Sequence, residues 1–422
     1  MLLKRLRKMT AAILILAVLL SGSALAEKTI VLTFTGDVTL GGRDDERRLP
    51  DSFDSIAASK GYDYFFKNFK EMFEQDDLTV INLEGPLTDS SLNKSTKTHA
   101  FRGKKEFAKI LQISGVDAAS LSNNHAADYK EQGDKNTKEA LDEYGVHWFK
   151  DNDYYLFEKD GIRIAFFGLQ NTTLYNEKPK AKFLKAIEKA RQEDGASFIV
   201  ICWHTGTEYK GFHEADTENR ITRLINDGYG DLFVNNHPHV AQGMSIVNNR
   251  NVFYSLGNFV FGGNRNIRSG KQSKDPYGIS LYALVVQVRL TFTDAGQYLG
   301  QQAVVYPVFS SSKRPNYKVG EDFPPADGRL LFSNDFQPMR LTIEQAADVY
   351  ECVRRDTAFE LPEMTEKDGL AQIVFPYLPA FDGFMIPEDE EEGTVGQPGA
   401  SSPTPTRDTK DDHMTEGDTN HD

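Results

Sequence analysis

The sequence predicts an α/β fold built from layered sheets. Short β-rich runs alternate along the chain with segments of helical periodicity, which is the pattern that layered α/β proteins show. Many of the β-rich runs are strongly apolar and stop abruptly at polar residues. No internal repeat is evident, and 422 residues suffice for a large core in one to three domains.

The first three predicted strands each end in side chains that can bind a cation. They are residues 29–35 before Gly36-Asp37, residues 78–83 before Glu84-Gly85-Pro86, and residues 118–121 before Ser122-Asn123-Asn124-His125. The carboxylates therefore fall where a strand meets a turn. Taken alone, each could equally be an ordinary turn residue, because aspartate and asparagine are frequent in turns.

The later strands continue the alternation. Residues 154–158 and 161–169 predict a hairpin around an Asp-Gly turn, and the apolar run 198–203 leads directly into His204. The remaining predicted strands are residues 232–234, 252–254, 279–292 and 302–308. Residues with apolar side chains at helical spacing predict helices; they are residues 65–73, 104–113, 135–144, 182–192 and 218–226.

The stretch after residues 232–234 contains His237-Pro238-His239. Pro238 favours extended backbone at the residue before it, and residues two apart in an extended segment face the same side. The two imidazoles are therefore expected to point at one spot, and neutral imidazole is the commonest metal ligand. The alternative is a pair of exposed histidines in a turn.

Composition excludes one class of partner. The net charge is −14, and because nucleic-acid binding usually needs a basic surface, no nucleic-acid partner is expected. The chain has two cysteines, Cys202 and Cys352, too few for a disulfide-stabilised scaffold. One bridge between them is conceivable, but Cys202 lies inside a strand-like run and is better explained as a small core residue.

Both termini differ from the rest of the chain. Residues 1–26 combine four basic residues, an apolar run and an Ala-Leu-Ala ending, which predicts a signal peptide and an extracytoplasmic (secreted or cell-surface) protein; an uncleaved anchor is the alternative. Residues 387–422 hold eleven acidic and two basic residues and almost no apolar ones, which predicts a disordered tail. Residues 27–386 are expected to form the folded domain with a C-terminal extension.

The polar strand ends form one candidate set of metal ligands. All its members offer oxygen or nitrogen and none offers a thiolate, which suits divalent Mn, Fe or Zn. Four of the nine histidines in the chain belong to it, which makes chance placement a poor explanation. The set consists of Asp37, Glu84, Asn124, His125, His204, His237 and His239.

The motifs around these residues resemble the CapA family of capsule synthesis, also called poly-γ-glutamate biosynthesis proteins, within the calcineurin-like metallophosphoesterase superfamily. The likeness runs from about residue 29 to residue 307. The motifs that carry it are Gly36-Asp37, Asn82-Leu83-Glu84, Asn123-Asn124-His125-Ala126, the run 203–209 (WHTGTEY), His237-Pro238-His239-Val240 and the run 254–259 (YSLGNF).

This resemblance implies a four-layer α/β/β/α sandwich with one or two divalent metal ions at one rim of the paired sheets. It implies that His125 acts as general acid or stabilises developing charge. The ligands that it implies are Asp37 and His239 for a first metal, Glu84 as the bridge, and Asn124, His204 and His237 for a second metal.

The sequence departs from the broader superfamily at three positions. Thr39 stands where many members have a histidine of the first metal site, Glu84 replaces a bridging aspartate, and Asn236 precedes His237 where glycine is common. The first metal site thereby lacks one strong ligand.

Three further residues have open roles. Glu208 could orient a ligand or be a solvated loop residue. Asn258 could orient the rim loop or stabilise a turn, and Asn82 could reach the metal site or satisfy backbone groups.

Two functions of different classes follow. The first is an extracytoplasmic metal-dependent hydrolase or transferase in the synthesis, export or processing of capsule or poly-γ-glutamate, acting on a phosphoester or an amide bond. The second is a non-catalytic, metal-binding accessory subunit of a membrane polymer synthase. Expected partners are an anionic cell-surface polymer or its precursor and membrane-bound capsule synthase subunits. A polymer-binding domain without metal is the third possibility, because fold does not establish reaction.

Overall fold

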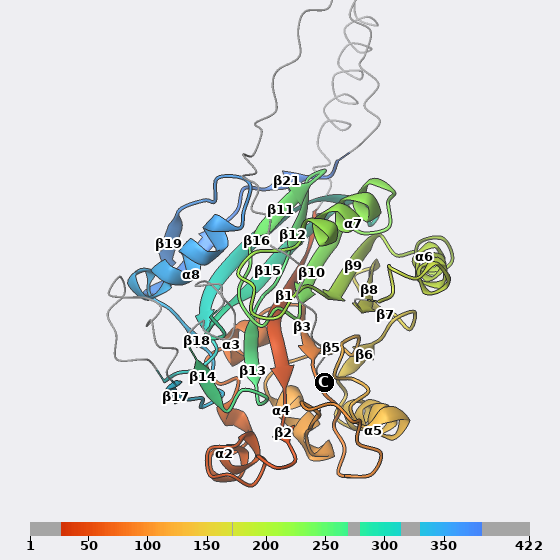
Figure 1. Ribbon diagram of the computed structural model, residues 1–422. Coiled ribbons are helices and arrows are strands. Elements are labelled where there is room, and N and C mark those ends of the chain that lie inside the picture. Colours follow the sequence, from red (N-terminus) through yellow and green to blue (C-terminus); the bar gives the residue numbers. More distant parts are fainter. Residues whose placement is uncertain (1–26, 171, 269–278, 314–329, 382–422) are drawn as a thin grey trace, which may run out of the picture. The chain divides into compact units, whose positions relative to one another are not determined.

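The computed structural model describes residues 27–170, 172–268, 279–313 and 330–381. Within these residues the chain forms two large sheets with helices packed against them (Figure 1). The strands of the larger sheet are β1 (Lys28–Thr39), β3 (Leu78–Leu83), β5 (Ala118–Ser120), β6 (His147–Phe149), β13 (Asn258–Phe261), β15 (Tyr282–Phe292), β16 (Tyr298–Phe309), β18 (Met339–Arg340), β19 (Met364–Lys367), β20 (Leu370–Val374) and β21 (Leu378–Pro379).

The main path of the larger sheet runs β19-β20-β16-β15-β1-β3-β5-β6. Strands β1, β3, β5 and β6 are parallel, whereas β15 and β16 are antiparallel to their neighbours. Strand β13 pairs with the end of β1, and β18 and β21 pair with β16. Two small antiparallel pairs lie outside the two large sheets, namely β2 (Gly42–Arg43) with β4 (Phe101–Arg102) and β14 (Asn266–Arg268) with β17 (Leu330–Ser333).

The smaller sheet has the order β11-β12-β10-β9-β8-β7. Its centre is parallel, so the carboxyl ends of β8, β9, β10 and β12 lie at one edge. The predicted hairpin at Asp160-Gly161 joins its first two strands, and both turn residues have positive φ. Its strands are β7 (Tyr155–Lys159), β8 (Ile162–Gln170), β9 (Phe198–His204), β10 (Leu232–Asn236), β11 (Met244–Val247) and β12 (Arg250–Phe253).

Most of the helices cover the outer faces of the two sheets, and the last one packs on the inner face of the larger sheet. Helix α6 shows why these segments are helical, because its buried residues Phe183, Ile187 and Ala190 are spaced on one helix face. The described helices are α2 (Phe53–Lys60), α3 (Lys70–Glu74), α4 (Ala108–Ile113), α5 (Lys130–Glu143), α6 (Glu177–Gln192), α7 (Ala215–Asn226) and α8 (Ile343–Arg355), with single 3₁₀ turns η1 (Tyr62–Tyr64) and η2 (Lys105–Phe107).

Three hydrophobic clusters define the layers. One lies between the sheets and joins residues of β1, β3 and β15 to residues of β8, β9 and β10; helix α8 extends this cluster on the same face of the larger sheet. A second fills the space between the larger sheet and helices α2 to α5. A third lies between the smaller sheet and helices α6 and α7. The predicted α/β fold and its α/β/β/α layer order are confirmed.

The aromatic run at residues 65–73 is helical only at its end, in α3, and the earlier part forms turns. The prediction of one helix there was wrong because the helical spacing of phenylalanines reflects burial rather than continuous helix. Phe65, Phe66, Phe69 and Phe73 are all buried in the cluster beneath the larger sheet. Three of them, Phe66, Phe69 and Phe73, contact the ring of Phe259 in β13.

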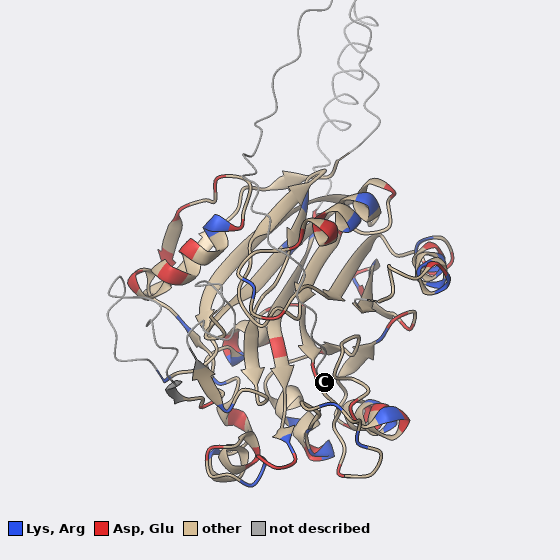
Figure 2. Cartoon of the chain, in the orientation of Figure 1, with Lys and Arg blue, Asp and Glu red and all other residues tan. Residues whose placement is uncertain are grey.

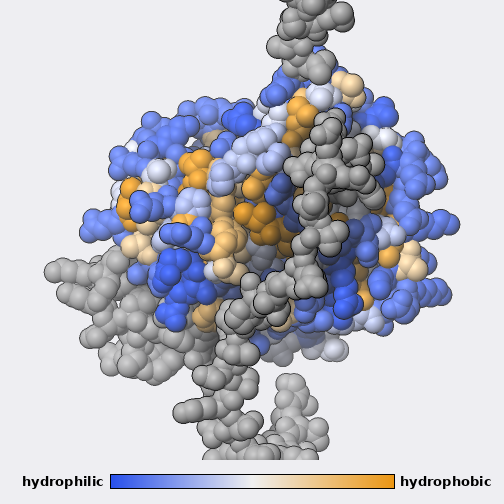
Figure 3. Space-filling model, turned by 90° about the horizontal axis from the view of Figure 1, so that it is seen from above, coloured by the Kyte–Doolittle hydropathy of each residue, from blue (hydrophilic) through white to orange (hydrophobic). Residues whose placement is uncertain are grey.

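Lys, Arg, Asp and Glu concentrate on the helices and connecting loops, while the sheets are nearly free of them (Figure 2). The face in Figure 3 is mainly hydrophilic, with hydrophobic residues near its middle. Cys202 and Cys352 do not form a disulfide and pack in or against the core between the sheets.

Among the residues that the structure describes, no helix has the length and apolar character to cross a bilayer. The predicted signal peptide at residues 1–26 and the predicted tail at residues 387–422 lie outside the described residues. The proposed domain boundaries therefore stay predictions.

Candidate metal centre

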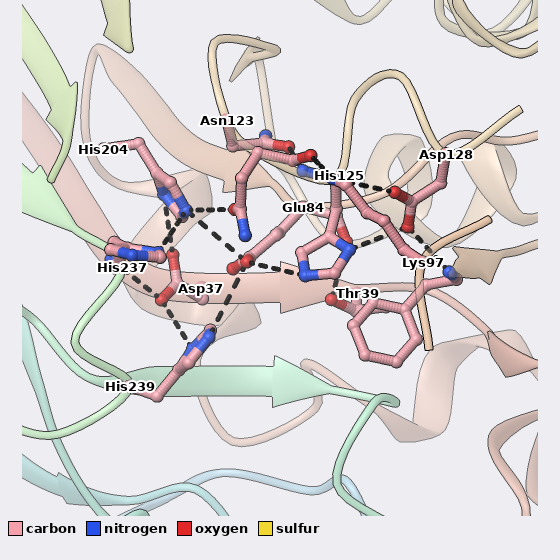
Figure 4. Close-up of polar contacts among 12 residues, drawn as sticks. Asp37, Thr39, Glu84, Lys97, Asn123, His125, Asp128, His204, His237 and His239 are labelled. Atoms are coloured by element: carbon pink, nitrogen blue, oxygen red, sulfur yellow. Dashed lines mark hydrogen bonds and ion pairs between the residues drawn. The ribbon is translucent and has the colours of Figure 1, made fainter. Parts of the chain in front are cut away.

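The carboxyl ends of the parallel strands of both sheets meet at one place, and the candidate ligands converge there (Figure 4). Glu84 directly follows β3, and His125 lies in the loop after β5. His204 is the last residue of β9, and His237 and His239 follow β10. The larger sheet thus supplies the carboxylates, and the smaller sheet supplies three of the imidazoles.

Asp37 lies within β1, not on a loop after it. The sequence predicted a strand that stops at Gly36-Asp37, but β1 changes partner there and continues. It pairs with β15 as far as Phe34 and with β13 from Asp37, with a register shift in between. Gly36 permits this change, because a Cβ at that position would lie 2.1 Å from the carbonyl oxygen of Gly257.

Glu84 is the centre of the cluster. Its backbone is fixed on both sides, since its N–H donates to Val38 O at 2.7 Å and its carbonyl accepts from the Thr39 hydroxyl at 2.7 Å. The side chain is fully buried. Among the described residues neither carboxylate oxygen has a hydrogen-bond partner. Its Oε1 lies 3.5 Å from His204 Nε2, 3.7 Å from His239 Nε2 and 3.9 Å from His125 Nε2.

His237 and His239 come together by a different route from the one expected. Extended backbone was predicted at His237, but His237 has φ 105° and His239 has φ 59°. Non-glycine residues seldom adopt such angles, and they concentrate at functional sites. The two rings stand 6.0 Å apart because a tight turn redirects each of them, not because of strand alternation. The His237 N–H donates to Asp37 Oδ2 at 3.3 Å, which helps to hold this turn.

The side chains form two groups that share Glu84. Asp37, Glu84 and His239 make one group, and Glu84, His204 and His237 make the other; within each group, ligand atoms lie within 4.8 Å of one another. Asp37 Oδ2 is 3.1 Å from His239 Nδ1, and His204 Nε2 is 3.1 Å from His237 Nδ1. Asn124 is exposed, with its Oδ1 2.8 Å from His204 Nε2. These are the residues that the resemblance implied as ligands, and their ligand roles remain predictions.

Electrostatics distinguish the imidazoles. Burial lowers the pKa of His204 and His237 to about 3, so both rings are neutral at pH 7 and able to bind a cation. For His239 burial acts in the same direction, but Glu84 and Asp37 raise the pKa to about 10. The His239 ring therefore carries a proton between two carboxyl groups, at a place where a metal cation could replace it.

The two carboxyl groups have opposite shifts. Burial, followed by the charge of Asp37, raises the pKa of Glu84 to about 8. Burial would also raise the pKa of Asp37, but the hydrogen bond and charge of His239 bring it to about 2. At neutral pH the pair thus holds one proton, as closely spaced carboxyls do.

These residues fit a divalent metal ion. The donor set of two carboxylates and several imidazoles suits Mn, Fe or Zn. Glu84 supplies the structural test, because a buried carboxylate without hydrogen-bond partners is costly unless a cation accepts its lone pairs. Divalent metal binding is therefore supported by the geometry.

His125 is held at the edge of this cluster by Asp128, which sequence reasoning missed. His125 Nδ1 lies 2.7 Å from Asp128 Oδ2, and the ring packs against Phe101 at 4.5 Å. Asp128 is buried and also accepts from Phe101 N at 2.8 Å and from Lys97 Nζ at 3.4 Å. The spacing of three residues between His125 and Asp128 was the available signal.

The residues with open roles fall on both sides of the cluster. Asn82 reaches it, since its Nδ2 donates to Asp37 Oδ1 at 2.7 Å and lies 3.2 Å from His204 Nδ1. Asn258 Oδ1 is 2.9 Å from His239 Nδ1 and so orients that ring. Glu208 is exposed and stands at the rim with His237 and His239.

A cavity of about 400 Å³ opens beside the cluster. Its lining includes His125 and His239 together with the aromatic residues Phe101, Tyr209 and Phe261. Arg43 and Arg265 add positive charge, although each already pairs with an aspartate, Asp45 and Asp51 respectively. The cavity gives a solvent-accessible route to the buried ligands.

The sequence matches a family model described as bacterial capsule synthesis protein PGA_cap over residues 31–263, more than half of the chain. It is 27% identical over 255 residues to the capsule biosynthesis protein CapA of Bacillus anthracis, covering 55% of this chain and 60% of that protein. It is 27% identical over 256 residues to the PGA biosynthesis protein CapA of Bacillus subtilis, covering 56% of this chain and 67% of that protein. The chain thus matches only about two thirds of these relatives' length.

Two solved structures are distantly similar. A phosphatase from Mycoplasma pneumoniae aligns with a TM-score of 0.39 and 13% identity, covering 67% of this chain and 95% of that chain. The calcineurin-like phosphoesterase YfkN from Bacillus subtilis aligns with a TM-score of 0.37 and 15% identity, covering 65% of this chain and 88% of that chain.

Proposed function

This chain belongs to the bacterial capsule synthesis protein family PGA_cap, and on that premise we propose that it is a metal-dependent hydrolase of capsule synthesis. Its substrate is an anionic cell-surface polymer or a precursor of one, such as poly-γ-glutamate. The observation that carries the proposal is the buried Glu84 carboxylate, which lacks hydrogen-bond partners and is shared by two groups of ligands. The class of polymer is proposed only because the two Bacillus relatives are named as capsule and PGA biosynthesis proteins.

The chain's own residues would divide the chemistry between them. Asp37, Glu84, Asn124, His204, His237 and His239 would hold one or two divalent ions. A metal bound there would acidify a water molecule and neutralise charge that develops on the substrate. His125 would hold a proton at Nε2 and deliver it to the leaving atom, while Asp128 fixes the ring through Nδ1. A phosphoester and an amide bond both suit this arrangement.

We place the site of action outside the cytoplasm, on the basis of the predicted signal peptide at residues 1–26. The expected partners are the polymer and membrane-bound capsule synthase subunits. Nucleic acid is not expected, because the net charge is −14.

An accessory, non-catalytic role is the second candidate. It is favoured by Thr39, whose hydroxyl donates to the Glu84 carbonyl. Because the Thr39 hydroxyl is engaged in this way, the first ligand group consists of Asp37, Glu84 and His239 among the described residues. A metal there could bridge the two sheets without turning over a substrate.

The deciding experiment combines metal content with turnover for the full chain. Wild type, Glu84→Gln and His125→Asn are loaded with Mn²⁺, and bound metal is measured by mass spectrometry. Hydrolysis of bis-p-nitrophenyl phosphate and of poly-γ-glutamate is then followed. We expect metal in wild type, its loss in Glu84→Gln, and retained metal with turnover reduced about 10²- to 10⁴-fold in His125→Asn.

Glu46→Gln is the matched control, because Glu46 lines the same cavity but belongs to neither ligand group. Metal binding without hydrolysis of either substrate would favour the accessory role. Absence of bound metal in wild type would refute both proposals.

A further inference from the structure

We propose that Glu208 is an additional ligand of the metal held by the Asp37–Glu84–His239 group. This inference rests on the proposed metal centre. Divalent ions of this kind take four or more ligands, and that group contributes three side chains. Thr39 lies two residues after Asp37 in β1 and therefore on the same face of the strand. Its hydroxyl donates to the Glu84 carbonyl.

Glu208 lies close to one histidine of each ligand group. One of its carboxylate oxygens and one ring nitrogen each of His237 and His239 lie within 4.8 Å of one another. His239 belongs to the first group and His237 to the second. Ligands of one metal lie about 3 to 4 Å apart when each bond is near 2.1 Å, so this exposed side chain needs only a small movement to reach ligand spacing from the two imidazoles.

The backbone on both sides of Glu208 is fixed to the turn that carries the two histidines. Thr205 N donates to Asn236 O at 3.0 Å, and Tyr209 N donates to Pro238 O at 2.8 Å. Tyr209 has φ 60°, an angle that costs energy for an aromatic residue. The position of Glu208 relative to His237 and His239 is therefore set by main-chain hydrogen bonds.

Glycine at position 206 permits this close approach. Gly206 has φ 113°, and a Cβ there would stand 3.1 Å from Pro238 Cγ. The backbone of this loop thus packs closely against the Pro238 ring. If Glu208 were an ordinary solvated residue, its loop would not have to be held so close to the histidines. If Glu208 binds the same metal as His237 and His239, the loop must be held there.

Mn²⁺ affinity and stoichiometry test this inference without reference to turnover. Titration calorimetry on the full chain compares wild type with Glu208→Gln, which keeps the shape but removes the charge, and with Glu208→Asp, which keeps a shorter carboxylate. Because loss of a group that merely supports a ligand costs about 10- to 100-fold in affinity, Glu208→Gln should weaken one site by at least that factor. The Mn²⁺ affinity of Glu208→Asp should lie between the affinities of wild type and Glu208→Gln.

Co²⁺ in place of Mn²⁺ gives a second readout, since its visible absorption reports the ligand set; the spectrum should change in Glu208→Gln. Glu46→Gln, which removes a charge from the same cavity, should match wild type within about twofold in affinity, as a charge outside the ligand groups acts only at a distance.

Equal affinity in wild type and Glu208→Gln would overturn the inference and leave the proposed function intact. Equal weakening in Glu208→Gln and Glu46→Gln would overturn it as well, because the effect would then be general electrostatics. Failure of wild type to bind any metal would remove the proposed function together with this inference.

Discussion

At the scale of single residues, Glu84 explains why the site is a strong candidate for a cation. Its carboxyl group is fully buried, and both oxygens lack hydrogen-bond partners among the described residues. An unsatisfied buried group of this kind costs about 1–3 kcal/mol, and more when it is charged. The three histidine Nε2 atoms nearest to it lie 3.5–3.9 Å away, which is too far for hydrogen bonds but suitable for sharing a cation.

Asp128 offers a test of how His125 works. Replacement of Asp128 by Asn should lower turnover about 10- to 100-fold, part of the contribution expected of a general acid, because the ring loses its charged acceptor at Nδ1. Metal content should not change, since Asp128 is in neither ligand group. The same replacement in a His125→Asn background should have almost no further effect on kcat.

This double-mutant comparison separates a role through His125 from a structural one. If Asp128→Asn lowers kcat equally in both backgrounds, Asp128 acts through the loop that Lys97 and Phe101 help to hold.

At the scale of elements, helix α8 connects the C-terminal extension to the metal-binding loop. A capping box of Thr342 and Gln345 begins the helix, and Asp356 follows its last turn. The Asp356 carboxylate accepts from Gly243 N at 2.8 Å and lies 2.9 Å from His213 Nδ1. Gly243 ends the loop that carries His237 and His239, and a Cβ there would lie 2.1 Å from Asp356 O.

The Asp356–His213 pair predicts a pH-dependent contribution to stability. Burial would lower the pKa of His213, but the hydrogen bond and charge of Asp356, with Glu218, raise it above its usual 6.5. The protonated ring therefore stabilises the fold fully below pH 6.5, and this stability is lost as pH rises through the higher folded pKa. Asp356→Asn should lower the free energy of unfolding by about 2–3 kcal/mol at pH 6 and by less at pH 9.

Urea denaturation at the two pH values measures this difference. The control is Glu344→Gln, an exposed change on the same helix, which should stay within about 0.5 kcal/mol of wild type. A loss for Asp356→Asn that is the same at pH 6 and pH 9 would show that the His213 charge contributes nothing.

At the scale of the whole described unit, the metal centre joins the two sheets. Asp37 and Glu84 belong to the larger sheet, whereas His204, His237 and His239 come from the smaller one. A bound ion would therefore connect strands that otherwise meet through the apolar core between them. Binding to the folded state alone stabilises it by mass action, by about 2.7 kcal/mol at a free metal concentration of 100 Kd.

Metal loading should accordingly raise Tm, by several degrees for a chain of this size. The rise should be larger at pH 8 than at pH 6. Metal must displace protons from Glu84, with a pKa of about 8, and from His239, with a pKa of about 10, and fewer protons remain at higher pH. Scanning calorimetry with Mn²⁺ and with a chelator measures the shift. An equal shift at both pH values would contradict this proton competition.

Much of the layered fold and of the ligand cluster could be predicted, because strand ends and their polar residues are local features of the sequence. His204 and Glu84 follow directly from apolar strands. Other features depend on contacts distant in the chain. Asp356 reaches Gly243 across 113 residues, and no local pattern indicates this. The positive φ of His237, whose N–H donates to Asp37 Oδ2, runs against the extended backbone that Pro238 favours at the residue before it.

The change of partner within β1 has a consequence for how this architecture can diverge. Asp37 lies near the end of β1 but still within the sheet, with β3 on one side and β13 on the other. Neighbouring loops do not fix the position of its carboxylate, so insertions or deletions in them leave it in place. Homologous proteins could thus acquire rim loops of very different length, and with them different specificities, around an invariant anchor.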